Sequence, residues 1–151
     1  MSAVVLIPAP FYGDSPTHSH LTLLWAGNET TIGLMENLRR LRRIAGSIAR
    51  EHHAFEARCG GLTLFGPNRD EPVIFVELTE QIRDMRRQLD DYSASQFPFA
   101  PHIAIPKRDR LPNWSELPRS VWFHSIQVWD DPRPASLGPV FRFEAKLRGC
   151  A

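Results

Sequence analysis

Two short stretches of sequence determine the fold, HLTLLWAG at residues 20–27 and PHIAIPK at residues 101–107. Each stretch carries a histidine on a short apolar segment that is typical of a β-strand. Because side chains alternate between the two faces of a strand, His20 and Thr22 are predicted to project to the same side. Pro101 and Pro106 limit the second strand to a few residues. We therefore expect two strands that each present a histidine.

The residues outside these stretches alternate between strand and helix patterns. Apolar positions at helical spacing predict a first helix over about residues 31–52. They also predict a second helix that Thr79 can cap, with Ile82, Met85 and Leu89 on its inner face. Alternating or β-rich segments predict about eight strands, over residues 3–7, 20–25, 55–59, 62–65, 73–78, 102–105, 121–129 and 141–148. Strands separate the helices without strict alternation, which favours an α+β fold with antiparallel pairing.

Length and composition narrow the class of protein. With 151 residues, the chain is expected to form one domain over residues 1–151. An apolar content of 42% and a charged content of 23% argue against wholesale disorder. No apolar run reaches the length of a membrane span, and no secretion signal is evident, so we expect a cytoplasmic protein that does not bind membranes. A net charge of +1 excludes a global polyanion footprint, and any nucleotide must bind at a local site.

Two histidines that face each other suit phosphodiester chemistry. One imidazole can accept a proton from an attacking hydroxyl or water, while the other, in its protonated form, gives a proton to the leaving oxygen. A hydroxyl at Thr22 can donate a hydrogen bond to a phosphoryl oxygen. This chemistry requires no metal or other cofactor. His18 and His20 form a pair that could ligate a metal, but no further ligands follow at a suitable spacing.

The two stretches together resemble the two-histidine (2H) phosphoesterase superfamily, which includes the 2′-5′ RNA ligase-like cyclic phosphodiesterases. HLTLLWAG is similar to the family pattern His-x-Thr-Leu-x-Phe-Leu-Gly, and PHIAIPK is similar to Pro-His-x-Thr-Leu-x-Arg. The expected order of the other elements also agrees, so the resemblance covers nearly the whole chain. It implies a bilobal fold of two pseudo-symmetric lobes, with antiparallel strands and flanking helices around a central cleft. It further implies activity on cyclic phosphates or on 2′-5′ or 3′-5′ phosphodiesters.

The resemblance carries site roles onto particular residues, with two departures. His20 and His102 become the catalytic pair, in acid and base roles that the sequence does not assign to one or the other. Thr22 and Lys107 become phosphate-binding residues. Ala104 stands where the family has Thr or Ser, which removes one hydroxyl, and Lys107 stands where many members have Arg, which keeps the charge but loses the bidentate fork.

Aromatic residues supply candidates for binding a base. Tyr12 and Phe65, together with Phe11, are candidates to stack on a nucleobase. The near-neutral charge of the sequence favours a small nucleotide over a long RNA as substrate, with an RNA end as the alternative. No obligate protein partner is inferred.

Two functions are therefore open. The first is a metal-independent phosphodiesterase that cleaves a cyclic phosphate, a 2′-5′ or 3′-5′ phosphodiester, or a cyclic oligonucleotide signal. The second is a catalytically impaired module that binds and sequesters a nucleotide in the same cleft, with Ala104 as the mark of lost activity. The presence of both histidines favours the enzyme.

Overall fold

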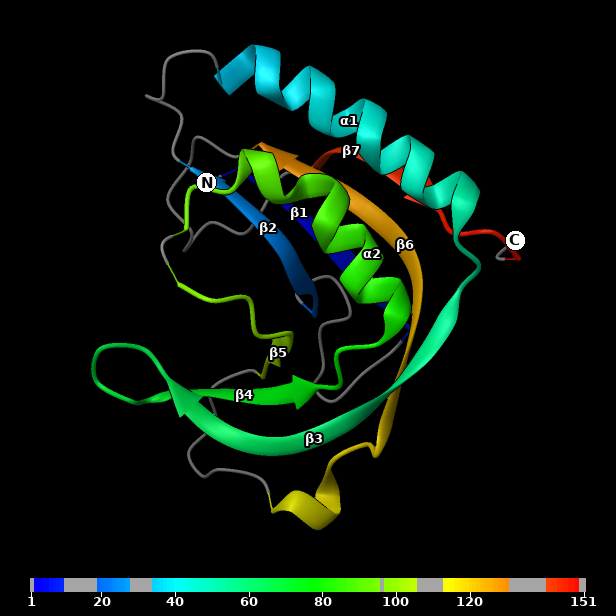
Figure 1. Cartoon of the computed structure of the whole chain (residues 1–151). Helices are drawn as coiled ribbons and strands as arrows, with labels where there is room; N and C mark the ends of the chain where they lie inside the picture. The colour runs from blue at the N-terminus through cyan, green and yellow to red at the C-terminus, as the bar shows by residue number, and fades with distance from the viewer. Residues whose placement is uncertain are drawn as a thin grey trace.

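The computed structural model describes residues 2–9, 19–27, 34–95, 97–105, 113–130 and 141–149. Its elements follow the order predicted from the sequence (Figure 1). The strands are β1 (Ser2–Pro8), β2 (Leu21–Gly27), β3 (Phe55–Phe65), β4 (Glu71–Val76), β5 (His102–Ala104), β6 (Ser120–Asp130) and β7 (Phe141–Lys146). The helices are α1 (Leu34–Glu51) and α2 (Glu80–Leu89), with short 3₁₀ turns η1 (Asp90–Tyr92) and η2 (Trp114–Glu116).

One sheet of seven strands, in the order β1-β2-β5-β4-β3-β6-β7, forms the framework. Among the described residues, every pairing between two of these strands is antiparallel. The long strand β6 pairs with β1 along one edge and with β3 and then β7 along the other, so the sheet closes on itself. The predicted α+β class with antiparallel strands is confirmed.

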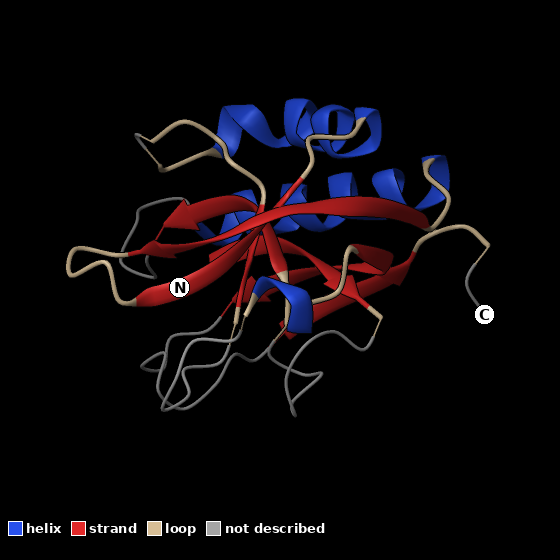
Figure 2. Cartoon of the chain, turned by 90° about the horizontal axis from the view of Figure 1, so that it is seen from below, coloured by secondary structure: helices blue, strands red, loops and turns tan. Residues whose placement is uncertain are grey.

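Both long helices cover the same face of the sheet (Figure 2). The inner face of α1 buries Leu38, Leu41, Ala45 and Ile48, and this helix packs against β6 and β7. The inner face of α2 consists of Ile82, Met85 and Leu89, as predicted, and packs against β2. Thr79 caps α2 through its hydroxyl, which accepts a hydrogen bond from the Ile82 N–H at 3.1 Å. Neither of these two helices covers the opposite face of the sheet.

The structure corrects one expected boundary. The glycine pair Gly60–Gly61 was predicted to separate two strands, but residues 55–65 form one strand, β3. The register with β4 shifts between Cys59 and Gly61, and Gly61 has a φ of 153°. A glycine tolerates this conformation because it has no Cβ. The glycines therefore form a bulge that bends β3 without ending it.

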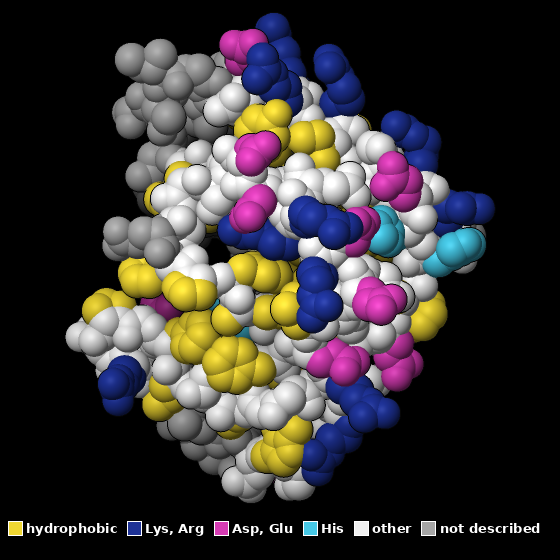
Figure 3. Space-filling view, in the orientation of Figure 1, with side chains coloured by type: hydrophobic (Ala, Val, Ile, Leu, Met, Phe, Trp, Pro, Cys, Tyr) yellow, Lys and Arg dark blue, Asp and Glu magenta, His cyan; other side chains and the backbone are white. Residues whose placement is uncertain are grey.

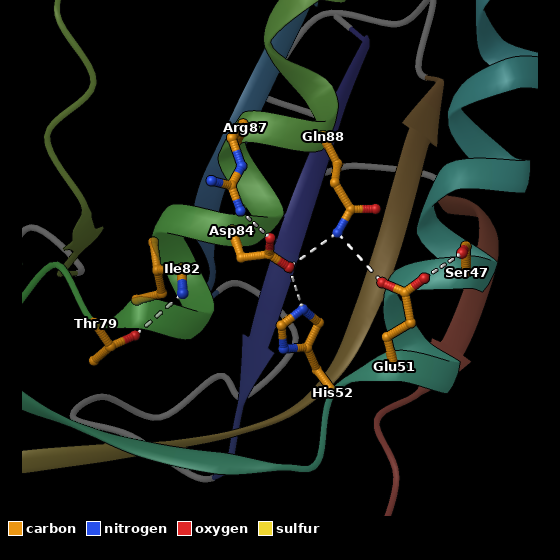
Figure 4. A network of polar contacts seen from close by, with 8 residues as sticks. All are labelled: Ser47, Glu51, His52, Thr79, Ile82, Asp84, Arg87 and Gln88. Carbon is orange, nitrogen blue, oxygen red and sulfur yellow. Dashed lines mark hydrogen bonds and ion pairs between the residues drawn. The ribbon is translucent and has the colours of Figure 1, made fainter.

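A polar network joins the C-terminal end of α1 to α2 (Figure 4). The Asp84 carboxylate lies 2.8 Å from His52 Nε2 and accepts hydrogen bonds from Arg87 at 2.6 Å and from Gln88 at 3.0 Å. Gln88 also donates to Glu51 at 3.5 Å. The hydrogen bonds from Arg87 and His52 hold the pKa of Asp84 below its ordinary value of 3.8. The charged carboxylate thus stabilises the packing of the two helices.

Replacing Asp84 by asparagine should lower the free energy of unfolding at pH 7 by about 1 kcal/mol, since a partly exposed charge contributes modestly. The folded-state pKa is depressed, so this contribution is present above the ordinary value and is lost as the pH falls through the folded value. Urea unfolding at pH 7 and pH 3 measures both points. Asp91→Asn, at an exposed aspartate in η1, is the control. An equal deficit for Asp84→Asn at both pH values would contradict this account.

Candidate active site

The two histidine strands meet in the middle of the sheet. Leu21 of β2 pairs with Ile103 of β5, and both side chains are fully buried in the core cluster that contains the inner faces of α1 and α2. Since strand side chains alternate, the residues on either side of this pair project to the opposite face. Antiparallel register then places Thr22 opposite His102 and His20 opposite Ala104.

This placement brings the two predicted catalytic histidines to one face of the sheet. His20, Thr22 and His102 are half-buried and Ala104 is exposed, as expected for side chains on an accessible surface. His20 directly precedes β2, and extending the register by one residue puts it diagonal to His102, a relation that typically separates backbones by roughly 7–8 Å. Side chains on such a diagonal can both reach one group the size of a phosphate. On this register, His20, Thr22 and His102 project to one face of the sheet.

Backbone and aromatic contacts fix the ring of His102. Its Nδ1 lies 2.7 Å from the carbonyl oxygen of Ala100. A carbonyl oxygen only accepts hydrogen bonds, so Nδ1 carries the hydrogen and Nε2 faces away from this partner. The ring of Phe65 makes an edge contact with His102 at 4.8 Å between centroids, and Phe75 backs Phe65 at 5.5 Å. Phe65, predicted as a base-stacking residue, thus directly contacts a predicted catalytic histidine.

A tryptophan that the sequence analysis did not single out orients His20. The centroid of the Trp129 ring lies 4.5 Å from that of His20. Trp129 Nε1 donates a hydrogen bond of 2.8 Å to Gln127, and its ring packs with Ala3 and Val5 in a small apolar cluster. Trp129 occupies one position in an apolar strand pattern, and nothing in that pattern marks it as the neighbour of a histidine 109 residues earlier in the sequence.

A cavity of about 730 Å³ opens beside His102. It lies between β2 and the segment that leads from η1 to β5. The Ala94 N–H donates a hydrogen bond of 2.9 Å to the carbonyl oxygen of Trp25, one of the lining residues. Its lining consists of Thr22, Leu23, Leu24, Trp25, Phe65, Gly66, Pro67, Arg86, Ser95, Phe97, Pro98, Phe99, Ala100 and His102. Figure 3 shows a hollow bordered by hydrophobic side chains on the face it draws.

The cavity takes in three of the predicted site residues, Thr22, Phe65 and His102. His20 lies on the same face of the sheet but does not line the cavity. Tyr12 and Lys107, predicted to bind substrate, lie outside the described residues, as does His18.

Arg86 is a lining residue that the sequence analysis missed. Its guanidinium donates to the Leu23 carbonyl, to Asp90 at 3.1 Å and to Ser93 at 3.3 Å, and lies 4.9 Å from the centre of the Phe99 ring. The sequence does contain a signal that could have identified Arg86, because positions 82, 85, 86 and 89 follow the spacing of the inner face of a helix. An arginine at an inner-face position needs polar partners, and here they come from both walls of the cavity.

The cavity lining contains no aspartate or glutamate among the residues that the structure describes. Metal-ligating side chains come within 4.8 Å of one another at Glu51, His52 and Asp84, in the network between the helices, and none of the three lines the cavity. Cys59 is buried, which raises the pKa of its thiol to about 11 and keeps it protonated at neutral pH. Among the described residues of the lining, the ionisable side chains are therefore Arg86 and His102.

None of the helices in the described part of the chain combines the length and the apolarity that a membrane span requires.

Comparisons with known proteins were made by sequence and by structure. No family model matches the chain, and no curated protein matches it. Solved structures do match over nearly its whole length. The protein TT0787 of Thermus thermophilus is 19% identical, covers 98% of both chains and has a TM-score of 0.62. A structure described as a phosphoesterase is 15% identical, with 97% of both chains covered and a TM-score of 0.57. LigT of E. coli, solved in complex with 3′-AMP, is 14% identical, with 97% of both chains covered and a TM-score of 0.59.

Proposed function

Because the chain has the fold of the two-histidine phosphoesterases, we propose that it is a metal-independent phosphodiesterase. Its substrate is a small nucleotide or an RNA end that carries a cyclic phosphate, a 2′-5′ or 3′-5′ phosphodiester, or a cyclic oligonucleotide linkage. One observation carries the proposal: the Leu21–Ile103 register places His20, Thr22 and His102 on one accessible face of the sheet.

The arrangement supports general acid–base catalysis. One imidazole accepts a proton from the attacking water, whose oxygen forms a bond to phosphorus. The bond from phosphorus to the leaving ester oxygen breaks, and the other imidazole, in its protonated form, gives that oxygen a proton. The Thr22 hydroxyl donates a hydrogen bond to a phosphoryl oxygen and stabilises the charge that builds there. Water is consumed, and the phosphodiester is converted into an alcohol and a phosphate monoester.

The comparison with LigT supports a nucleotide as substrate, since that protein was solved with 3′-AMP. The test is to incubate the purified protein, in the presence of EDTA, with 2′,3′-cyclic nucleotides, 2′-5′ and 3′-5′ dinucleotides, and cyclic di- and trinucleotides. Turnover is the expected result. Recovery of a stoichiometrically bound, intact nucleotide would contradict the enzyme and support a sequestering module. Turnover that requires added zinc or manganese would contradict the metal-independent mechanism.

Restoring the missing hydroxyl by Ala104→Thr should raise kcat/KM on a 2′,3′-cyclic nucleotide. Ala104 is exposed and stands opposite His20, so a hydroxyl there has room to donate to the same phosphoryl group. A hydrogen bond to a charged group contributes about 1.5–3 kcal/mol, or roughly a 10- to 100-fold change.

The matched control for this variant is Ala104→Val, which adds similar bulk without a donor. We expect it to give no gain. A gain of equal size with valine would contradict the hydrogen-bond explanation. A fall in activity with threonine would indicate that Ala104 makes room for a bulkier substrate.

A further inference from the structure

The cavity extends from only one of the two histidines. Thr22 and His102 line it, whereas His20 stands on the other side of the Leu21–Ile103 pair. If a phosphoryl group is held between the histidines, as the proposed function requires, only the substituent on its His102 side can enter the cavity. The volume of about 730 Å³ lies within the usual range for sites that bind small organic molecules.

Aromatic rings dominate the lining. Trp25, Phe65, Phe97 and Phe99 all face the cavity, and two prolines complete its walls. Phe97 is 72% exposed, the largest exposure among the large hydrophobic residues that the structure describes. An exposed phenylalanine at the edge of an aromatic cavity gains apolar contacts when a flat ligand covers it.

Three polar groups of the lining are engaged within the protein: the Arg86 guanidinium, the Ser95 hydroxyl and the Ala100 carbonyl. Arg86 donates to Leu23, Asp90 and Ser93, as described above. The Ser95 hydroxyl accepts a hydrogen bond of 3.2 Å from the Phe97 N–H, and the Ala100 carbonyl is bonded to His102. These groups hold the cavity walls in position. Because they already form hydrogen bonds within the protein, they are poorly placed to form hydrogen bonds with the polar edge of a ligand. A flat group would therefore be held by its faces.

We propose that this cavity binds the nucleobase on the His102 side of the substrate by stacking, accepts purines and pyrimidines alike, and is held in shape by Arg86 as a positioning residue. This inference rests on the proposed function for the place of the phosphoryl group. Arg86 connects β2, through Leu23, to the opposite wall, through Ser93 and Phe99. The stacking surface needs both walls at a fixed separation.

The test compares the 2′,3′-cyclic phosphates of adenosine, guanosine, cytidine and uridine with methyl riboside 2,3-cyclic phosphate, which carries methoxy in place of the base. The four nucleotides should have KM values within about fivefold of one another, and the methyl riboside a KM roughly 10- to 100-fold higher. Equal KM values for nucleotides and methyl riboside would overturn the inference and leave the proposed function standing. A preference of more than about 30-fold for one base would overturn binding by stacking alone.

Calorimetric measurement of the binding of these compounds to the protein separates a failure of the cavity assignment from a failure of the proposed phosphodiesterase function. If none of these compounds is turned over, the proposed function fails for this substrate class, and the same ranking is then expected in Kd. Equal Kd values for the methyl riboside and the nucleotides, or no binding of any of them, would overturn the cavity assignment.

Three variants test whether the difference in KM between methyl riboside and nucleotide arises in the cavity. Phe97→Ala, at an exposed residue that the fold does not need, should reduce the KM ratio between methyl riboside and nucleotide at least about fivefold. Arg86→Met should reduce the same ratio about 10-fold by releasing the two walls. Arg87→Met removes the same charge one residue further along α2, where the guanidinium contacts Asp84, and should leave the ratio unchanged. An unchanged ratio in Phe97→Ala, or equal effects of Arg86→Met and Arg87→Met, would contradict the assignment.

Discussion

Replacing either His20 or His102 by alanine is expected to lower kcat on a 2′,3′-cyclic nucleotide about 10²- to 10⁴-fold, the range for loss of a general acid or base. Each imidazole serves a different oxygen on the same phosphorus, so neither replaces the other. The double variant should therefore be little worse than the worse single variant, because residues that act as a unit are not additive.

Steady-state kinetics with a circular dichroism spectrum of each variant provide the measurement. His53→Ala is the control, since His53 is an exposed histidine at the end of α1, outside the cavity lining. It should keep wild-type activity. A His20→Ala or His102→Ala protein that is folded and keeps more than about a tenth of wild-type kcat would contradict the paired roles.

Replacing Leu21 by alanine should lower the free energy of unfolding by about 2–5 kcal/mol. Leu21 is fully buried and pairs with Ile103, which is also fully buried, at the junction of the two histidine strands. Truncation removes apolar burial and leaves a cavity that a closed sheet cannot easily fill. This loss is a large share of the roughly 5–15 kcal/mol by which native proteins are typically stable.

Urea unfolding of the variant measures this effect. The matched control is Leu64→Ala, a strand leucine with 37% exposure, which should cost less than about 1 kcal/mol. Equal losses for the two variants would contradict the central place of the Leu21–Ile103 pair. A Leu21→Ala protein that unfolds at the same urea concentration as wild type would contradict it as well.

Local patterns in the sequence predicted most of the elements. The inner face of α2 and the alternation of β7 follow directly from apolar spacing, and Thr79 was identified as a cap from its position before an amphipathic segment. The boundary predicted at Gly60–Gly61 was wrong because two glycines in a strand are compatible with either a break or a bulge. The pairing of β3 with β4 decided between them.

Local sequence patterns did not predict which elements that are far apart in the chain become neighbours in the fold. The helix α1 follows β2 in the chain but packs against β6 and β7, because the closed sheet brings the end of the chain beneath it. The meeting of His20 with Trp129, and of Arg86 with Leu23, likewise depends on which strands become neighbours. Local patterns predicted two short segments that each carry a histidine, and the family resemblance assigned the two histidines to one catalytic pair. The Leu21–Ile103 register supplies a physical reason for them to share a face.

The central claim is that His20 and His102 act on one phosphorus atom, and a crystal structure with bound inorganic phosphate or vanadate tests it most directly. We expect one ion on the accessible face, with a ring nitrogen of each histidine and the Thr22 hydroxyl at roughly 2.6–3.2 Å from its oxygens. An ion held by only one of the histidines, with the other ring turned away from it, would contradict the account.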